Sequence, residues 1–291
     1  MIQTSWQLKD LIRNLSKETG IEAHVLIRRF IMERFLERIS LSRYRDQFVL
    51  KGGLLVSAFV GTAVRATMDM DTTIKGLPVT KDNMTRIIGE ICDVKLDDNI
   101  TFKMNGVSDI LDEAEYGGLR FAMEAHLDGS VTPLKIDIST GDAITPRENL
   151  YSYKLMFEDR SISIMTYPIE TVLAEKLETL IARSVTNTRM RDFYDIHVLL
   201  NSEKQEIDDV TLQKALSATS IQRGSAERMK DAENVLVALA GSSLMQDLWK
   251  SYQRKFPYAA DASWNDVMSS ARKLAHAAGL SVEQPFGIES K

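Results

Sequence analysis

The sequence predicts an α+β fold with a mixed α/β core, in which N-terminal helices and a C-terminal helical lobe accompany a small mixed sheet. Apolar residues recur at helical spacing from residue 5 to about 45. Helical and alternating stretches are then mixed up to about residue 165, and almost everything after Pro168 has helical periodicity. We therefore expect three regions, namely 1–45, 46–165 and 166–291.

The length and composition are those of an ordinary globular protein. The 291 residues suffice for a core in two domains or lobes, and 44% of them are hydrophobic and 26% charged. A net charge of −5 excludes the overall basic balance of a typical nucleic-acid binder. The single Cys92 excludes an internal disulfide, and the sequence has neither a membrane-length apolar run nor a signal peptide at Met1. These observations predict a cytoplasmic protein.

The N-terminal region is locally basic. Helical spacing links Leu8 to Leu15, Gly20 interrupts it, and the pattern resumes over 25–39. Residues 1–51 contain ten basic and six acidic side chains, an excess of four. Two interpretations stay open: a solvated helix face, or a surface for a polyanionic substrate around four arginines, Arg28, Arg29, Arg34 and Arg38.

The core region combines two helices with several strands. Residues 53–60 predict a short helix after a glycine turn, and 80–94 predict a longer one with Thr80 as its N-cap. A hairpin is expected at Gly129-Ser130. Alternation of apolar and polar residues predicts strands at 67–74, 100–107, 118–127 and 134–138.

The C-terminal region is predicted to be helical. Pro168 suits the first turn of a helix that continues to about residue 183. A second helix is expected over 193–200, and helical patterns fill 209–280. The last ten residues are expected to form a loose tail.

Two aspartates and a glycine pair form the most informative motif. Asp69 and Asp71 would share one face of a strand, because side chains alternate along it. Neighbouring carboxylates repel each other, and a divalent cation relieves that repulsion. Gly52 and Gly53 follow Lys51, permit a tight turn, and would aim the N–H groups of the next helix at a phosphate. The motif points to an enzyme that handles nucleotides.

A third carboxylate completes the set. Asp137 lies on the opposite strand face from Ile136 and Ile138, and an acid in a buried strand is costly unless it is compensated. Taken alone, it suits an exposed sheet face. Together with Asp69 and Asp71 it could hold one or two Mg²⁺ (or Mn²⁺) ions that clamp a triphosphate and stabilise in-line attack on its α-phosphorus.

Three further residues are candidates for the site. Lys176 lies in the apolar stripe of its helix, where a lysine either extends to the surface or meets an anion. Asp192 shares a helix face with apolar residues and suits either helix capping or the site, whereas Asp195 is expected in a structural pair with an arginine. Arg65 could neutralise phosphate or pair with the carboxylates.

The order of these motifs resembles a known family. The apolar run, Gly-Gly, Asp-x-Asp and later apolar-Asp-apolar pattern is similar to the DNA-polymerase-β-like nucleotidyltransferases, with Gly-Gly in place of the more frequent Gly-Ser. Over residues 5–200 the chain resembles more closely the AbiEii/AbiGii nucleotidyltransferase toxins of bacterial type IV toxin–antitoxin and phage-defence systems. The motifs that carry the resemblance are Phe48-Val49-Leu50-Lys51-Gly52-Gly53, Arg65-x-Thr67-x-Asp69-x-Asp71, Ala174-Glu175-Lys176 and Arg191-Asp192-Phe193-Tyr194-Asp195.

The resemblance implies an activity and a set of roles. It implies metal-dependent transfer of NMP from NTP to RNA, above all to the tRNA 3′ end, with growth arrest as the result and a separate antitoxin protein as partner. The implied metal ligands are Asp69, Asp71 and Asp137. The C-terminal domain would contribute Lys176, which contacts phosphate, and Asp192, as a base or to orient Lys176. The implied nucleotide-binding residues are Lys51, Gly52, Gly53, Arg65, Thr67 and Lys176.

Two alternative functions stay open. The same chemistry could act on a small hydroxylated, antibiotic-like molecule, or the chain could be a non-catalytic homologue whose aspartates bind a structural cation. Other enzyme classes are disfavoured. The four histidines have no metal-ligand spacing, the single cysteine has no obvious histidine partner, and no P-loop sequence occurs.

Overall fold

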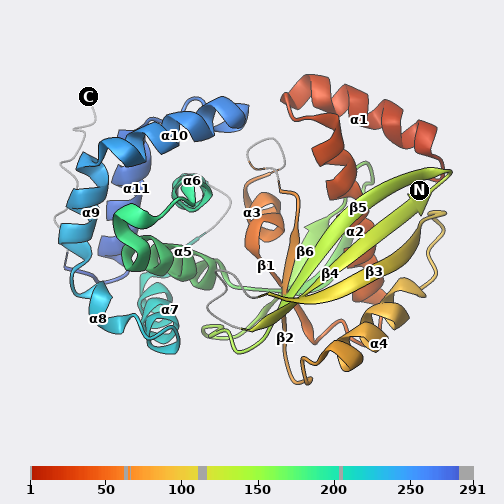
Figure 1. Ribbon diagram of the computed structural model, residues 1–291, viewed down its shortest axis with the longest axis horizontal. Helices are drawn as coiled ribbons and strands as arrows, with labels where there is room; N and C mark the ends of the chain where they lie inside the picture. The colour runs from red at the N-terminus through yellow and green to blue at the C-terminus, as the bar shows by residue number, and fades with distance from the viewer. Residues whose placement is uncertain (1, 62–64, 66, 111–116, 203–205, 282–291) are drawn as a thin grey trace. The chain divides into compact units, whose positions relative to one another are not determined.

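The computed structural model describes residues 2–61, 65, 67–110, 117–202 and 206–281 (Figure 1). The chain divides into two compact units. The first unit comprises Met1–Asp142 and Glu148–Tyr167, and the second comprises Ala143–Arg147 and Pro168–Lys291. The predicted loose tail lies outside the described residues.

The first unit contains a mixed seven-stranded sheet, which confirms the predicted fold class. The strand order is β3-β4-β5-β2-β1-β7-β6, and only the β1/β7 and β2/β5 pairs are parallel. Its helices are α1 (Ser5–Thr19), α2 (Ala23–Leu41), α3 (Gly52–Val60) and α4 (Lys81–Cys92). Its strands are β1 (Phe48–Lys51), β2 (Met70–Ile74), β3 (Thr101–Ile110), β4 (Gly118–Leu127), β5 (Ser130–Ser139), β6 (Asn149–Lys154) and β7 (Ser161–Thr166).

Most elements of this unit agree with the sequence pattern. Thr80 caps α4 as predicted, because its side chain accepts a hydrogen bond from the Asn83 N–H. Strands β6 and β7 were not predicted, although their residues also alternate between buried and exposed positions. The strand predicted over 67–74 begins only at Met70, so Asp69 immediately precedes β2.

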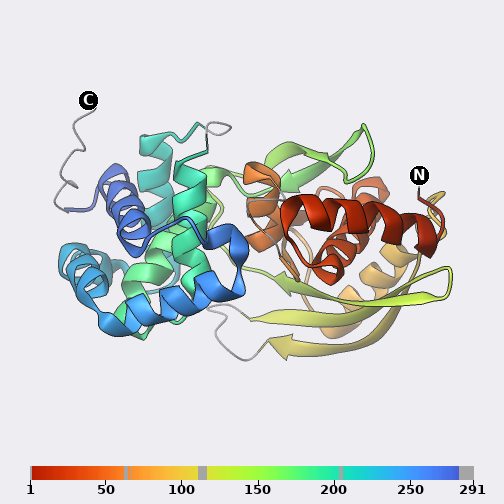
Figure 2. The ribbon, with the colours of Figure 1, turned by 90° about the horizontal axis from the view of Figure 1, so that it is seen from above.

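Helix α2 is the central helix of this unit. It packs against α1, α4 and the strands β5 and β7 (Figures 1 and 2). Nearly its whole second half is buried, and this half includes charged residues. A helix that is surrounded on all sides can keep such residues only if each charge finds a partner.

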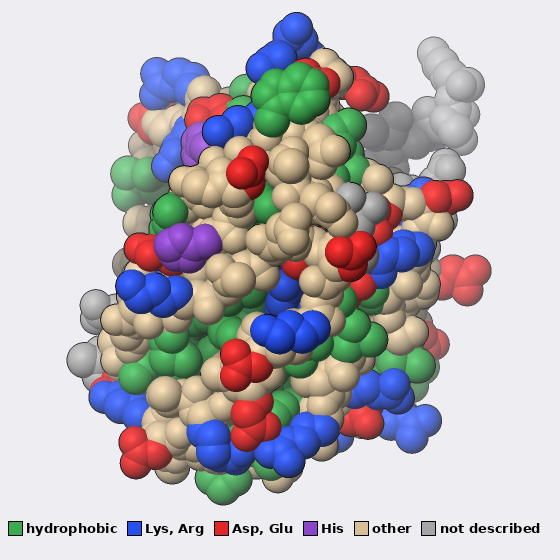
Figure 3. All heavy atoms as spheres, turned by 90° about the vertical axis from the view of Figure 1, so that its right-hand side faces the viewer, with side chains coloured by type: hydrophobic (Ala, Val, Ile, Leu, Met, Phe, Trp, Pro, Cys, Tyr) green, Lys and Arg blue, Asp and Glu red, His purple; other side chains and the backbone are tan. Residues whose placement is uncertain are grey.

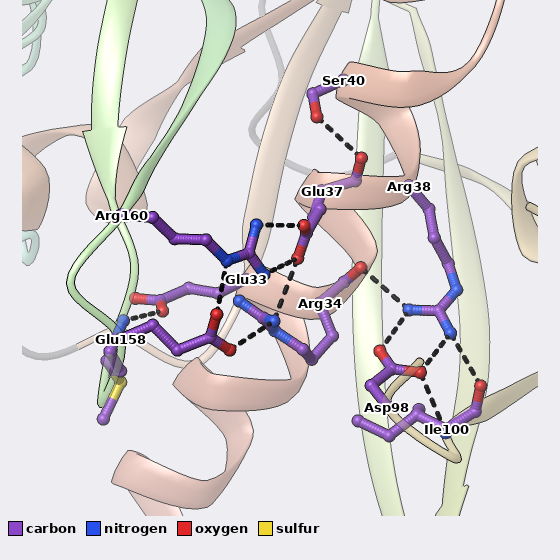
Figure 4. A network of polar contacts seen from close by, with 10 residues as sticks. Glu33, Arg34, Glu37, Arg38, Ser40, Asp98, Ile100, Glu158 and Arg160 are labelled. Atoms are coloured by element: carbon purple, nitrogen blue, oxygen red, sulfur yellow. Dashed lines mark hydrogen bonds and ion pairs between the residues drawn. The ribbon is translucent and has the colours of Figure 1, made fainter. Parts of the chain in front are cut away.

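The partners of the α2 arginines include acids from distant parts of the chain as well as acids of α2 itself (Figure 4). Arg38 donates to both carboxylate oxygens of Asp98, each at 2.8 Å. Arg34 contacts Glu158 at 3.0 Å, as well as Glu37 within its own helix. Arg29 pairs with Glu33 at 3.1 Å and also bonds to Ser57.

The predicted polyanion surface is therefore wrong for these three arginines. Arg29, Arg34 and Arg38 are 5%, 0% and 2% exposed, so they form neither a solvated face nor a binding surface. Arg28 is partly exposed. The face of the molecule in Figure 3 carries acidic and basic side chains interspersed with one another. Sequence alone could not reveal this, because the compensating acids at 98 and 158 are brought to α2 by the fold.

The second unit is helical, as predicted. Helix α5 lies at its centre and packs against α6, α7, α8, α9 and α11. An aromatic cluster around Tyr194 and Trp249 joins α6 to α10 and to the turn after α10. None of the helices in the described part of the chain is both long and apolar enough to cross a membrane. The helices are α5 (Ile169–Arg183), α6 (Met190–Leu200), α7 (Asp209–Gln222), α8 (Ala226–Met229), α9 (Ala232–Gly241), α10 (Ser243–Lys255) and α11 (Trp264–Ala277).

Removing one partner of a buried pair in the first unit should be costly. Arg38→Ala leaves the buried Asp98 carboxylate without its guanidinium, and we expect it to lower the free energy of unfolding by about 3–5 kcal/mol. Arg43→Ala removes an ion pair to Glu90 whose side chains are 68% and 37% exposed, and should lower the free energy of unfolding far less, because water screens the pair. Urea unfolding at pH 7 measures both. Equal losses would contradict a structural role for the buried pair.

Candidate active site

Four charged side chains form a row across the middle of the sheet. The strand registers place Lys51 of β1 opposite Asp71 of β2, Asp71 beside Asp137 of β5, and Asp137 opposite Arg120 of β4. Residues at matching positions on adjacent strands point to the same face. Asp71 and Asp137 thus lie on neighbouring strands, on the face opposite to the fully buried Met70 and Ile136.

Arg120 binds Asp137 through a two-pronged contact. Its Nε lies 2.8 Å from Oδ1 and its Nη2 lies 2.6 Å from Oδ2, so the guanidinium engages both carboxylate oxygens. The hydrogen bonds that Arg120 donates to Asp137 raise the pKa of Arg120, and the charges of Asp137, Asp69 and Asp71 raise it further although partial burial opposes this. Asp69 and Asp71 therefore lie close enough to act on the same guanidinium.

Sequence reasoning missed Arg120, although a signal for it exists. The tight turn at Asp128-Gly129 pairs Leu127 with Ser130, and counting back along both strands pairs residue 120 with residue 137. The hairpin was predicted one residue too late, at Gly129-Ser130. A turn placed one residue earlier would have located an arginine opposite the predicted carboxylate.

The glycine pair brings the backbone onto the carboxylates. Gly52 has φ +68°, and a Cβ there would collide with the Asp71 carboxylate. A Cβ at Gly53 would lie 2.7 Å from Thr67 Oγ1 and 3.2 Å from an Arg65 nitrogen. Glycine is required at both positions, at the first also because of its left-handed backbone. The start of α3 is therefore packed against three of the predicted site residues, Arg65, Thr67 and Asp71.

Lys51 is held by an acid that the sequence did not reveal. Its Nζ lies 2.7 Å from Oδ2 of Asp142, whose side chain is 1% exposed. Ser139 and Thr73 also donate to this carboxylate. Burial would raise the pKa of Asp142, but Lys51 and the two hydroxyl groups outweigh it and hold that pKa below its ordinary value. Asp142 lies beyond the end of β5, where no periodic pattern marks it.

Lys176 and Asp192 meet in the second unit. Lys176 Nζ lies 3.0 Å from Asp192 Oδ1 and 2.7 Å from Asp195 Oδ2, and the three side chains are 12%, 2% and 1% exposed. Asp195 is thus a partner of Lys176, where an arginine had been expected. Burial would lower the pKa of Lys176, but Asp195 and Asp192 outweigh it and raise that pKa. Lys176 is therefore a fixed positive charge.

The carboxylates of the strand row suit a divalent ion held by two of them better than an ion held by all three. Among the described residues, no group of three or more His, Cys, Asp or Glu side chains is arranged to hold a metal ion. Asp137 is engaged by Arg120 through both oxygens. Asp71 supplies carboxylate oxygens beside the glycine turn, and Asp69 lies two residues before it in the chain. Mg²⁺ is commonly held by one or two carboxylates together with substrate phosphates.

The glycine turn can be tested by two matched substitutions. Gly52→Ala forces a side chain into the Asp71 carboxylate and keeps a strained backbone, so it should lower the free energy of unfolding by about 1–3 kcal/mol. Gly89→Ala lies in α4 with nothing near its Cβ, and should raise that free energy by about 0.5–1 kcal/mol. Thermal unfolding of both variants measures these two changes in the free energy of unfolding. A neutral Gly52→Ala would disprove the close approach.

The Lys176 cluster should leave a signature in the pH dependence of stability. Burial opposes ionisation of Asp192, but Lys176 and Arg189 outweigh it and hold its pKa below the ordinary value of an aspartate. A lowered carboxyl pKa stabilises the folded state above the unfolded pKa, and this stabilisation is lost as pH falls through the folded pKa. We therefore expect Asp192→Asn to lower the free energy of unfolding by about 1–3 kcal/mol at pH 7.

That difference between Asp192→Asn and the unaltered chain should shrink below pH 4, as Asp192 becomes protonated in both states. Urea unfolding from pH 3 to 8 measures it, and Asp247→Asn, in an exposed pair with Lys250, serves as the control. A difference that is constant over the whole range would show that Asp192 is not held ionised by the cluster.

The solved structures that are similar to the chain match it over most of its length. Two crystal structures of Helicobacter pylori proteins, one of them JHP933, each share 17% identity and a TM-score of 0.47 with the chain. Each covers 89% of this chain, which in turn covers 95% and 92% of theirs. An antigenic nucleotidyltransferase-like protein from Paracoccidioides brasiliensis shares 12% identity and a TM-score of 0.36, over 92% of this chain and 94% of its own.

No curated protein matches the chain significantly. The family described as "Nucleotidyl transferase AbiEii toxin, Type IV TA system" matches residues 34–270, which span the strand row, the glycine turn and the Lys176 cluster. The chain therefore belongs to the AbiEii nucleotidyltransferase toxin family of type IV toxin–antitoxin systems.

Proposed function

We propose that this nucleotidyltransferase transfers a nucleoside monophosphate from NTP to an RNA acceptor, with the tRNA 3′ end as the first candidate. The observation that carries the proposal is the placement of Asp71 beside Asp137, directly against the Gly52 turn, in a member of this family. Carboxylates that face a side-chain-free turn suit a nucleotide whose triphosphate approaches the backbone.

Asp69 and Asp71 are the proposed ligands of Mg²⁺ or Mn²⁺. When bound, the ion would neutralise triphosphate charge and favour in-line attack at the α-phosphorus. Gly52 and Gly53 let the site side chains approach the backbone at the start of α3, whose backbone N–H groups are proposed to bind the phosphates. Arg65 and Thr67, which border Gly53, are proposed to contact the same phosphates.

Asp137 and Lys51 have more limited proposed roles. Asp137 keeps its proposed place as the third carboxylate of the site, oriented by Arg120. Lys51 is proposed for nucleotide binding on the strength of the family motif, although its ammonium is already neutralised by Asp142. Its contribution to phosphate binding should be smaller than that of an unpaired lysine, because the attraction is shared.

Lys176 and Asp192 are proposed to act on the nucleotide through a fixed charge. The Lys176 ammonium has three donors, and Asp192 and Asp195 accept two of them. The family resemblance assigns the matching lysine to nucleotide phosphate. In this role Asp192 orients Lys176, because a buried ammonium without carboxylate partners would lose its charge.

The RNA acceptor and the antitoxin partner rest on the family. Three of the four α2 arginines that had been predicted to hold RNA are engaged in buried ion pairs and do not support this role, namely Arg29, Arg34 and Arg38. A small hydroxylated acceptor and a non-catalytic homologue remain as the outcomes that an activity assay must separate.

The assay incubates the protein with each α-³²P-labelled NTP, with bulk tRNA in one arm and an aminoglycoside in the other. We expect label in tRNA, located by sequencing of the RNA 3′ ends. Asp71→Asn should reduce incorporation at least about 100-fold, because lost charge stabilisation raises the barrier by several kcal/mol. Asp109→Asn removes a half-exposed carboxylate on β3 that pairs with Lys81, and this control should leave the rate unchanged.

Each other outcome of this assay has a defined meaning. Label in the aminoglycoside alone would establish the small-molecule acceptor. Absence of label with every NTP and both acceptors would favour the non-catalytic homologue. Undiminished incorporation by Asp71→Asn would remove the proposed carboxylate mechanism.

A further inference from the structure

We propose that Arg120 is a positioning residue that stands in for a second metal ion: it occupies Asp137 and limits the site to one divalent cation at Asp69 and Asp71. This inference rests on the proposed function, in which those two aspartates bind the cation. It goes beyond that function by assigning the stoichiometry of the site and the residue that sets it.

The first argument is geometric. The guanidinium is planar and matches a carboxylate, and the two contacts of 2.8 and 2.6 Å show that Arg120 uses this fit on Asp137. A cation that bridged Asp71 and Asp137 would have to share or displace these bonds.

The second argument is that the backbone fixes the contact. Gly118 pairs with Ser139 at the start of β4, and a Cβ at Gly118 would lie 2.7 Å from the backbone oxygen of Ile138. The two strands therefore approach closely two residues before Arg120 reaches Asp137. Arg120 extends from a fixed point on a strand, so its contact with Asp137 belongs to the sheet rather than to a loop.

The third argument is charge balance. Lys51 and Asp142 neutralise each other at 2.7 Å. The other charges are three carboxylates, at 69, 71 and 137, and the guanidiniums of Arg120 and Arg65, which together give a local charge of −1. One divalent ion already outweighs this charge. A second would be repelled by that ion and by a guanidinium that stays protonated at every accessible pH.

The test is a titration of the full chain with Mn²⁺ alone, in which electron paramagnetic resonance measures the free ion. We expect the unaltered chain to bind one Mn²⁺, and Asp71→Asn to bind it at least about tenfold more weakly. Arg120→Gln frees Asp137 and changes the local charge from −1 to −2, so it should bind a second Mn²⁺ or bind the first about tenfold more tightly.

Two controls test whether Mn²⁺ binding depends on the positive charge at position 120 or on any positive charge of the protein. Arg120→Lys keeps the positive charge and should keep one ion per chain. Lys81→Gln removes an exposed lysine paired with Asp109 on β3 and should change neither stoichiometry nor affinity. Thermal unfolding of each variant verifies that it is folded.

The outcomes distinguish this inference from the proposed function. One ion that needs Asp71 and is unaffected by Arg120→Gln would overturn the role of Arg120 alone. Two ions in the unaltered chain would overturn it as well. Binding that does not depend on Asp71 would overturn both this inference and the metal site of the proposed function.

Discussion

The register of β2 between β1 and β5 is the constraint on which the candidate site depends. A slip of one residue would turn Asp71 to the opposite face and remove it from the row with Lys51 and Asp137. The other face of the same strands prevents the slip, because Met70 is buried beside Ile136 and would be exposed. Apolar packing on one face of the sheet therefore fixes the charged groups on the other.

Helix α2 packs on this sheet through buried ion pairs as well as apolar side chains. Its arginines hold the turn between β6 and β7 through Glu158 and the segment before β3 through Asp98. Buried ion pairs add little net stability compared with apolar packing, but breaking one leaves an uncompensated charge. We interpret the network as a device that specifies how α2 is aligned on the sheet, since apolar side chains would tolerate more than one alignment.

The sequence predicted those parts of the site that depend on local geometry. Alternation placed Asp71 and Asp137 on the polar faces of their strands, and helical spacing placed Lys176 in an apolar stripe where it meets Asp192. The errors concern partners that the fold brings from elsewhere. Arg34 was assigned to the surface because Glu158, 124 residues away, cannot be linked to it by periodicity. Asp142 was missed because its burial depends on Lys51 and Thr73, both on other strands.

The Lys176 cluster limits the chemistry that this lysine can perform. A general base or a nucleophilic amine needs a lowered pKa, which burial alone would provide. Here the two carboxylates at 192 and 195 reverse that effect, so the ammonium stays protonated at neutral pH. Lys176 can therefore attract negative charge but cannot accept a proton. A fixed cation of this kind suits phosphoryl chemistry, in which catalysis depends on positioning and on charge stabilisation rather than on proton transfer by the same group.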